Sequence, residues 1–137
     1  MFVVIIGCGR LGSHIASELS KLRHDVVVVD RSKEAFALLS ADFSGFQLIG
    51  DATEQETLRS ARVGEADVVA AVTENDNANL MIAQAAREIF GVKRLLARVS
   101  DPLKGDIYRT LGLRILCPTT VSAEAFEAEI LKREEES

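Results

Sequence analysis

Short apolar runs alternate along the chain with stretches in which apolar residues recur every three or four positions. Most of the short runs are continuous, which is typical of strands buried on both faces of a sheet. Val and Ile dominate the first two runs, as strands favour. The runs predict six strands, at residues 2–6, 25–29, 46–49, 67–72, 94–99 and 114–117.

The stretches between these runs predict helices. In the first stretch the apolar residues Leu11, Ile15, Leu19 and Leu22 share one face of a helix. The predicted helices are residues 10–22, 33–40, 54–61, 77–91, 102–112 and 121–137.

Capping signals mark several helix ends. We expect Ser32 to cap the second helix, and Thr53 with Glu56 to form a capping box for the third. Gly91 is expected to end the fourth helix, and Pro102 to take the first position of the fifth.

The regular order of strand and helix predicts an α/β fold, a Rossmann-like doubly wound parallel sheet of about six strands with right-handed crossovers. We assign residues 1–118 to this Rossmann-like domain and residues 119–137 to a C-terminal extra helix. We expect the earlier helices to cover both faces of the sheet.

Three glycines follow the first strand, in the sequence GCGRLG. Gly7 suits a tight turn, Gly9 a close approach of backbone N–H groups to a phosphate, and Gly12 close packing of the helix on the sheet. Asp30 ends the second strand, where a carboxylate accepts hydrogen bonds from ribose hydroxyls. Since phosphates favour a helix N-terminus, the pattern predicts a nucleotide site.

Two arginines refine this prediction. Arg10 lies in the glycine loop, where a guanidinium can cover phosphates. Arg31 either flanks the adenine or contacts a 2′-phosphate. Because Asp30 would repel such a phosphate, we expect a ligand without one.

Composition narrows the function. The chain has 137 residues, 47% of them apolar and 27% charged, which suits one soluble globular domain. A net charge of −5 with 5% aromatic residues argues against nucleic-acid binding. No stretch approaches the roughly 20 apolar residues of a membrane span, and the first residues do not resemble a signal peptide, so we expect a cytoplasmic protein. Cys8 and Cys117 are too few for a disulfide framework, and no metal-ligand spacing occurs.

No catalytic set can be assembled from the sequence. Hydride transfer needs a proton relay near the nicotinamide, and the single Tyr108 has no Lys four residues later. His14 and His24 lie on or after the first helix, away from the expected ligand edge. Cys8 is expected to be a packing residue and Cys117 a core residue. We therefore expect binding without catalysis.

The motifs together resemble a known family. The segments GCGRLGSHIASEL, VVVVD, LIGDAT, ARVSDP and LGLRILCP, with the spacing of Thr73, Asp76 and Asn79, are similar to the TrkA-N or RCK domain of bacterial and archaeal K⁺-transport regulators. The resemblance covers nearly the whole chain. The family usually continues into a smaller C-terminal ligand domain, so we expect either a fragment or a partner domain on another polypeptide.

The resemblance implies roles for matching residues. Phosphates would be held by Gly7, Gly9, Arg10, Leu11 and Gly12. Asp30 would bind the adenosine ribose, and Asp51 with Ala52 would meet the adenine edge. Thr73 would lie at the mouth of the cleft and Arg98 would face the distal part of a long ligand. For Asn79 two roles stay open: orienting the helix start, or contacting ligand.

Two classes of function follow. The resemblance implies a regulatory subunit that binds NAD(H), ATP, ADP or AMP and gates a membrane-embedded K⁺ transporter or channel from the cytoplasmic side. The alternative is the detached NAD-binding half of an oxidoreductase. The sequence does not choose among the nucleotides, which share adenine, ribose and phosphate.

The last predicted helix suggests self-association. Ala123, Phe126 and Ile130 share one face, beside a Glu-rich face that continues to residue 136. We expect a homodimer, and possibly a larger ring, with Phe126 and Ile130 in the shared core. The resembled family associates through such a helix.

Overall fold

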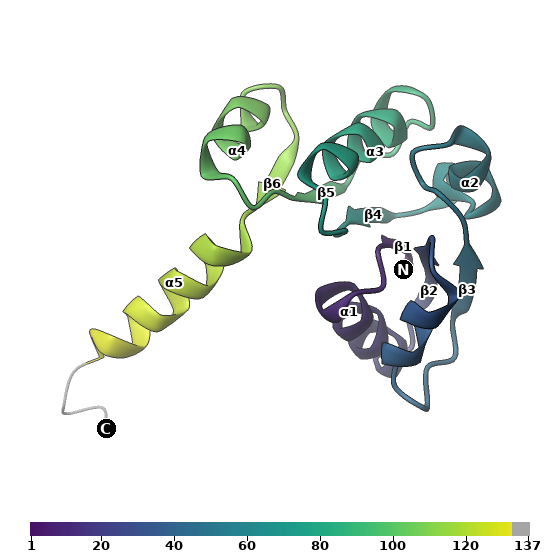
Figure 1. Cartoon of the computed structure of the whole chain (residues 1–137), viewed down its shortest axis with the longest axis horizontal. Helices are drawn as coiled ribbons and strands as arrows, with labels where there is room; N and C mark the ends of the chain where they lie inside the picture. Colours follow the sequence, from purple (N-terminus) through teal and green to yellow (C-terminus); the bar gives the residue numbers. More distant parts are fainter. Residues whose placement is uncertain (133–137) are drawn as a thin grey trace.

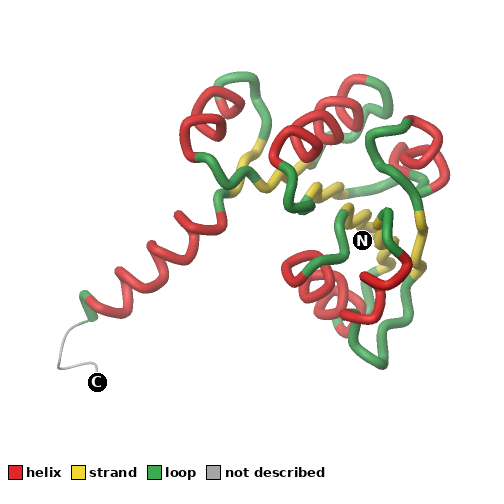
Figure 2. The backbone as a smooth tube through the Cα atoms, viewed as in Figure 1, coloured by secondary structure: helices red, strands yellow, loops and turns green. Residues whose placement is uncertain are grey.

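A single parallel sheet organises the protein (Figures 1 and 2). The computed structural model describes residues 1–132. Its strands are β1 (Phe2–Ile6), β2 (Asp25–Asp30), β3 (Phe46–Ile49), β4 (Val68–Ala71), β5 (Leu95–Arg98) and β6 (Arg114–Leu116). They are all parallel, in the order β3-β2-β1-β4-β5-β6, so the predicted doubly wound fold is confirmed.

Helices pack on both faces of this sheet. They are α1 (Arg10–Lys21), η1 (Lys33–Leu38), α2 (Gln55–Ser60), η2 (Val63–Glu65), α3 (Asp76–Glu88), α4 (Pro102–Arg109) and α5 (Pro118–Ile130), where η marks a 3₁₀ helix. One core cluster joins α1 and η1 to the face of β1 and β2 that carries Val3 and Val26. The opposite face packs against α2, α3 and α4. This division follows from right-handed crossovers, which change face where the strand order reverses beside β1.

Two predicted caps are confirmed and two are wrong. Gly91 has φ +68 after α3, and Asp101 caps α4, whose first residue is Pro102. Ser32 makes no capping hydrogen bond to η1, because its hydroxyl donates to Glu34 at 2.9 Å.

The predicted capping box of α2 does not form either. Thr53 donates its hydroxyl to Asp51 Oδ1 at 2.6 Å, and the helix begins later, at Gln55. In both places a nearby carboxylate competes with the helix for the hydroxyl.

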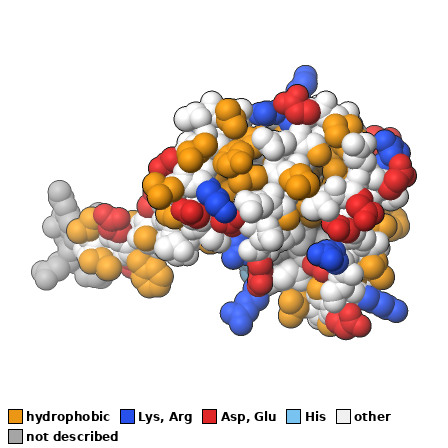
Figure 3. Space-filling model, turned by 45° about the horizontal axis from the view of Figure 1, so that its top comes forward, with side chains coloured by type: hydrophobic (Ala, Val, Ile, Leu, Met, Phe, Trp, Pro, Cys, Tyr) orange, Lys and Arg blue, Asp and Glu red, His pale blue; other side chains and the backbone are white. Residues whose placement is uncertain are grey.

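Helix α5 projects away from the rest of the molecule (Figures 1 and 3). None of its residues is buried, and Phe126, Ile130 and Leu131 just beyond its end are 71%, 77% and 73% exposed. Apolar and acidic side chains stand side by side along it in Figure 3. The Glu residues beyond 132 lie outside the described part of the chain.

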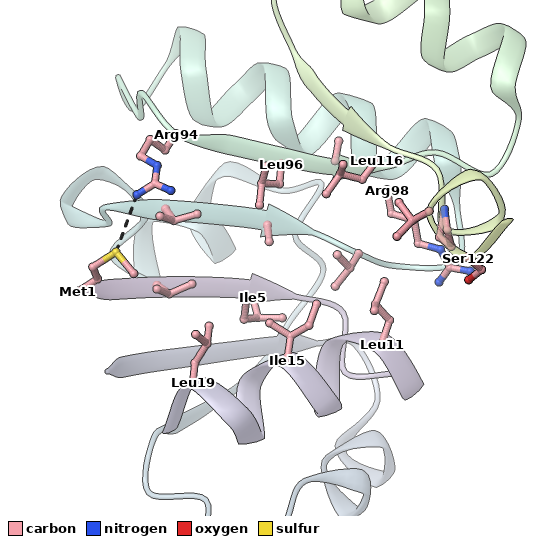
Figure 4. A pocket seen from close by; sticks show the side chains of 17 residues that line it. Met1, Ile5, Leu11, Ile15, Leu19, Arg94, Leu96, Arg98, Leu116 and Ser122 are labelled. Carbon is pink, nitrogen blue, oxygen red and sulfur yellow. Dashed lines mark hydrogen bonds between the residues drawn. The ribbon is translucent and has the colours of Figure 1, made fainter. Parts of the chain in front are cut away.

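The sheet is covered less completely than expected. On the side of α1, an apolar groove of about 410 Å³ lies over β5 and β6, and α1 and the first turn of α5 border it (Figure 4). Leu96 and Leu116 form its floor beside Leu11 and Ile15 of α1. We call this surface the open half-face. The expectation that the earlier helices cover both faces is therefore wrong.

Helix α1 explains part of this opening. Its buried residues are small, including Gly12, Ala16 and Ser17, so the helix lies close on β1 and β2. Its larger residue Leu11 stays exposed, as does the C-cap residue Leu22, and Leu11 borders the groove instead of entering the core. Among the described residues, no helix is both long and apolar enough to cross a membrane.

Candidate functional site

The turn from β1 into α1 is built from glycines that have no room for a side chain. Gly7 has φ +107, a conformation that L residues rarely adopt. A Cβ added there would lie 2.9 Å from the backbone nitrogen of Thr73. A Cβ on Gly12 would lie only 1.7 Å from the carbonyl oxygen of Gly7. These two glycines therefore let β1, α1 and the end of β4 meet.

Gly9 has a different role. A Cβ added to it meets no atom within 4 Å, so the space in front of this residue is open. Gly9 is the N-cap of α1 and makes no side-chain cap, and the first turn of the helix holds no acidic residue. Backbone N–H groups and the helix dipole at this end attract an anion. Arg10, the first residue of α1, adds a cation there.

Asp30 is held rigidly beside this turn. Its Oδ2 accepts a hydrogen bond from the backbone N–H of Cys8 at 2.8 Å, and its Oδ1 accepts one from the N–H of Ser32, also at 2.8 Å. The carboxylate thus joins the glycine loop to the end of β2. Each oxygen keeps a further lone pair for a ligand hydroxyl.

One continuous cleft follows the carboxyl ends of the strands, where open α/β sheets bind ligands. We call the smaller part, about 270 Å³, the Asp51 cavity, and Arg31, Asp51 and Ala52 line it. The larger part, about 640 Å³, is the glycine-loop cavity, which Gly9, Arg10, Leu11 and Arg98 line. Both parts share Gly7, Asp30, Thr73 and Glu74. The structure therefore gathers the residues singled out from the sequence, except Gly12, which lies beneath the loop.

The wall of the Asp51 cavity includes a carboxylate that is held in its charged form. Asp51 Oδ1 accepts hydrogen bonds from the hydroxyl and the N–H of Thr53, which hold the pKa of Asp51 below its ordinary value. The positive charge of Arg31 acts in the same direction. Asp51 therefore offers the cavity an ionised acceptor.

Asn79 orients the cleft instead of lining it. Its side chain is fully buried in α3 and makes hydrogen bonds to Thr73 and to the carbonyl of Arg98. It thereby ties the ends of β4 and β5 together. The sequence left open whether Asn79 orients the helix start or contacts ligand. The start of α3 is capped by Asn75, whose side chain accepts from the N–H of Ala78, and Asn79 lines neither part of the cleft, so its observed role is a third one.

Sequence reasoning missed Glu74, which lines both cavities. Its place directly after Thr73, at the end of a strand, was the available signal. The Nε of Arg98 is buried and has no hydrogen-bond partner in the described part of the chain. Arg98 lines the glycine-loop cavity and also the apolar groove (Figure 4).

The side chains that sequence analysis considered for catalysis lie elsewhere or are protonated. Tyr108 packs against the cluster under α3 and α4, and His24 Nδ1 lies 3.0 Å from the N-terminal amine. Cys8 is fully buried, and burial, with a smaller effect from Asp30, raises the pKa of its thiol to about 11. Within residues 1–132 no group of three metal-ligating side chains occurs.

Comparison with known proteins identifies the family. The sequence profile of the TrkA-N domain matches residues 3–118. The Trk system potassium uptake protein TrkA of Streptomyces coelicolor is 39% identical over 133 residues, 97% of this chain and 58% of that protein. The homologue of Pyrococcus abyssi is 33% identical over 134 residues, 97% of this chain and 59% of that protein. The chain thus spans less than two thirds of the relatives it matches.

Solved structures agree on the fold. Shewanella denitrificans Kef CTD in AMP bound form has a TM-score of 0.78 at 22% identity, covering 96% of this chain and 80% of that one. The GsuK channel bound to NAD has a TM-score of 0.70 at 20% identity, covering 84% of this chain and 21% of that one. At these identities the likeness concerns the fold alone. The family assignment depends on the profile match over residues 3–118, and on that ground the chain belongs to the TrkA-N domain family.

Proposed function

We propose that the chain is a regulatory nucleotide-binding module whose cleft takes an adenine nucleotide, NAD(H), ATP, ADP or AMP. The observation that carries the proposal is the juxtaposition of an anion-attracting helix end, open in front of Gly9, with a rigid carboxylate at Asp30. The first recognises phosphate and the second recognises ribose.

In this proposal the Asp51 cavity takes the adenine and its ribose. Asp51 and Ala52 meet the adenine edge, and Arg31 flanks it. The phosphates lie over Gly9 at the start of α1, under Arg10. The glycine-loop cavity has room beyond the phosphates for a second nucleoside, with Arg98 facing it.

Similar proteins support this class of ligand. One structure with the same fold is in an AMP bound form and another is bound to NAD. Both ligands share the adenosine monophosphate unit that the cleft is proposed to recognise. Asp30 opposes a 2′-phosphate, so NADP is disfavoured.

The partner is proposed from the relatives. Proteins of the Trk potassium uptake system are matched over nearly the full length of this chain. The module would therefore act from the cytoplasmic side on a membrane-embedded K⁺ transporter or channel. It would respond to a bound nucleotide and would catalyse no reaction of its own.

Self-association is part of the proposal. In one copy of the chain, the apolar side chains of α5 are exposed and the groove of the open half-face is empty of side chains from the described residues. In a dimer, the apolar side chains of α5 from one copy would pack against the open half-face of the other copy. Helix α5 would thus cross to the partner, with Phe126 and Ile130 in the shared core. Since Pro118 lines both the groove and the glycine-loop cavity, such a contact would lie beside the nucleotide.

The test of the function is the identity of the nucleotide that the protein retains. Protein purified without added ligand is denatured, and the released small molecules are identified by mass spectrometry. We expect an adenine nucleotide from the wild type and much less from Gly9→Ala. Release of a ligand without adenine, in stoichiometric amount, would overturn the proposal.

A further inference from the structure

Thr73 lies where the two cavities of the cleft meet, and its hydrogen-bonding polarity is set by Asn79. The Asn79 side chain is fully buried, so its amide must find partners inside the protein. Asn79 Nδ2 lies 2.9 Å from the carbonyl oxygen of Thr73 and 2.8 Å from that of Arg98. Carbonyl oxygens only accept hydrogen bonds, so the atom facing them has to be the amide nitrogen.

The other end of the amide is then the oxygen, and it faces Thr73. Asn79 Oδ1 accepts the Thr73 N–H at 3.0 Å and the Thr73 hydroxyl at 2.6 Å. The alternative acceptor for that hydroxyl is the Asn75 carbonyl at 3.3 Å, which also belongs to the protein. The proton of Thr73 Oγ1 is therefore donated to an acceptor of the protein in either case.

The lone pairs of the same oxygen are only partly used. The N–H of Asn75 donates to Thr73 Oγ1 at 3.2 Å. A hydroxyl oxygen has two lone pairs, so one remains free. Thr73 lines both cavities, and what it presents there is an acceptor.

We infer that Thr73 selects a hydrogen-bond donor on the ligand, a hydroxyl or an amine, and not a phosphate oxygen. This inference rests on the proposed binding of an adenine nucleotide in the cleft. A phosphate oxygen against Thr73 would place two acceptors face to face. The phosphates are thereby directed to the Arg10 side of the glycine-loop cavity, and a sugar hydroxyl or an amino group lies against Thr73.

Asn79 is a positioning residue in this scheme. It contributes no lining to either cavity, and it acts by fixing which way the Thr73 hydroxyl points. The same amide also holds the backbone at Arg98, so one buried side chain fixes the backbone at both Thr73 and Arg98.

The test measures which ligand group Thr73 senses. Thr73→Val removes the hydroxyl at nearly constant shape, Thr73→Ala removes it without the branched side chain, and Thr73→Ser retains it. Each variant is checked by thermal unfolding and then titrated calorimetrically with adenosine, AMP, ADP and NAD. The AMP analogues lacking the 2′-hydroxyl, the 3′-hydroxyl or the adenine amino group complete the panel.

One lost hydrogen bond between neutral groups predicts a loss of about threefold to tenfold for Thr73→Val, and little change for Thr73→Ser. If the donor is on the adenosine unit, Thr73→Val should lose affinity for every ligand except the one analogue that lacks this donor. If the donor is on the second nucleoside, Thr73→Val should lose affinity for NAD alone. An affinity loss that grows from adenosine to AMP to ADP overturns the inference. So does an equal loss for every ligand, all three analogues included, or no loss for any of them. If the wild type binds none of them, the proposed function itself fails.

Discussion

At the scale of single residues, Asp30 has two tasks that must be separated. It holds the N–H groups of Cys8 and Ser32, and it is proposed to accept ribose hydroxyls. Asp30→Ala should weaken AMP and NAD by about tenfold to hundredfold, the usual cost of a hydrogen bond to a charged group. In calorimetry the loss should shrink for 2′,3′-dideoxyadenosine monophosphate, which has no ribose hydroxyls. An equal loss for that analogue would mean that Asp30 only shapes the loop.

Arg10 is the residue expected to sense phosphate. Because it stands at the start of α1 beside Gly9, Arg10→Ala should weaken ADP and ATP more than adenosine, by about tenfold for a charge-assisted contact. Arg59→Ala is the control, since Arg59 pairs with Glu56 on an exposed helix away from the cleft. Equal weakening of all three ligands in the same titrations would indicate an effect on loop shape.

At the residue scale, the sequence patterns predicted some local features well and others poorly. The spacing of the glycines predicted the turn, because Gly7 and Gly12 have no room for a side chain, whereas Gly9 leaves the space in front of α1 open. Hydroxyl caps were predicted less well. Ser32 and Thr53 each had a carboxylate two residues away, and a pattern of helix signals does not show that Glu34 and Asp51 compete for those hydroxyls.

At the scale of elements, the strand–turn–helix unit separates stability from binding. Gly12→Ala drives a Cβ into the Gly7 carbonyl and should destabilise the fold by about 1–3 kcal/mol, as overpacking does. Gly9→Ala meets no protein atom, so it should leave thermal unfolding unchanged while its methyl group crowds the phosphates. Unfolding curves and AMP titrations of both variants test this. Normal AMP affinity in Gly9→Ala would show that the phosphates do not lie over residue 9.

Helix α5 and the open half-face form the second pair of elements. Phe126→Ser with Ile130→Ser should convert a dimer to a monomer in sedimentation velocity, because both side chains are proposed to be shared. Glu124→Ser, on the opposite side of the helix, is the matched control and should stay dimeric. If the wild type is monomeric at high concentration, or truncation after Pro118 leaves the dimer intact, α5 is not the contact.

Coverage of the sheet could be anticipated only in part. Continuous apolar runs suggested strands buried on both faces, and Leu96 and Leu116 do face the apolar groove. The pattern of the runs does not show whether a helix of the same chain covers them. Right-handed crossovers place α3 and α4 on the far face, so the α1 side of β5 and β6 is left with a groove that α1 and the first turn of α5 only border.

At the scale of the whole molecule, the proposal separates binding from catalysis. The cleft collects groups for ribose and phosphate, while Tyr108 lies against the α3 and α4 cluster and the Cys8 thiol has a pKa of about 11. We therefore expect no steady oxidation of NADH by the pure protein with small carbonyl substrates, followed by absorbance at a wavelength specific to NADH. Sustained turnover that Asp30→Ala abolishes would favour the detached half of an oxidoreductase.

The central claim is that this cleft recognises the adenosine monophosphate unit, and titration calorimetry of the wild-type chain tests it most directly. AMP and NAD should each bind at one site per chain, and Gly9→Ala and Asp30→Ala should weaken both. GMP should bind more weakly, because Asp51 and Ala52 are proposed to meet the adenine edge. Absence of heat with every adenine nucleotide, or binding that neither variant weakens, would contradict the account.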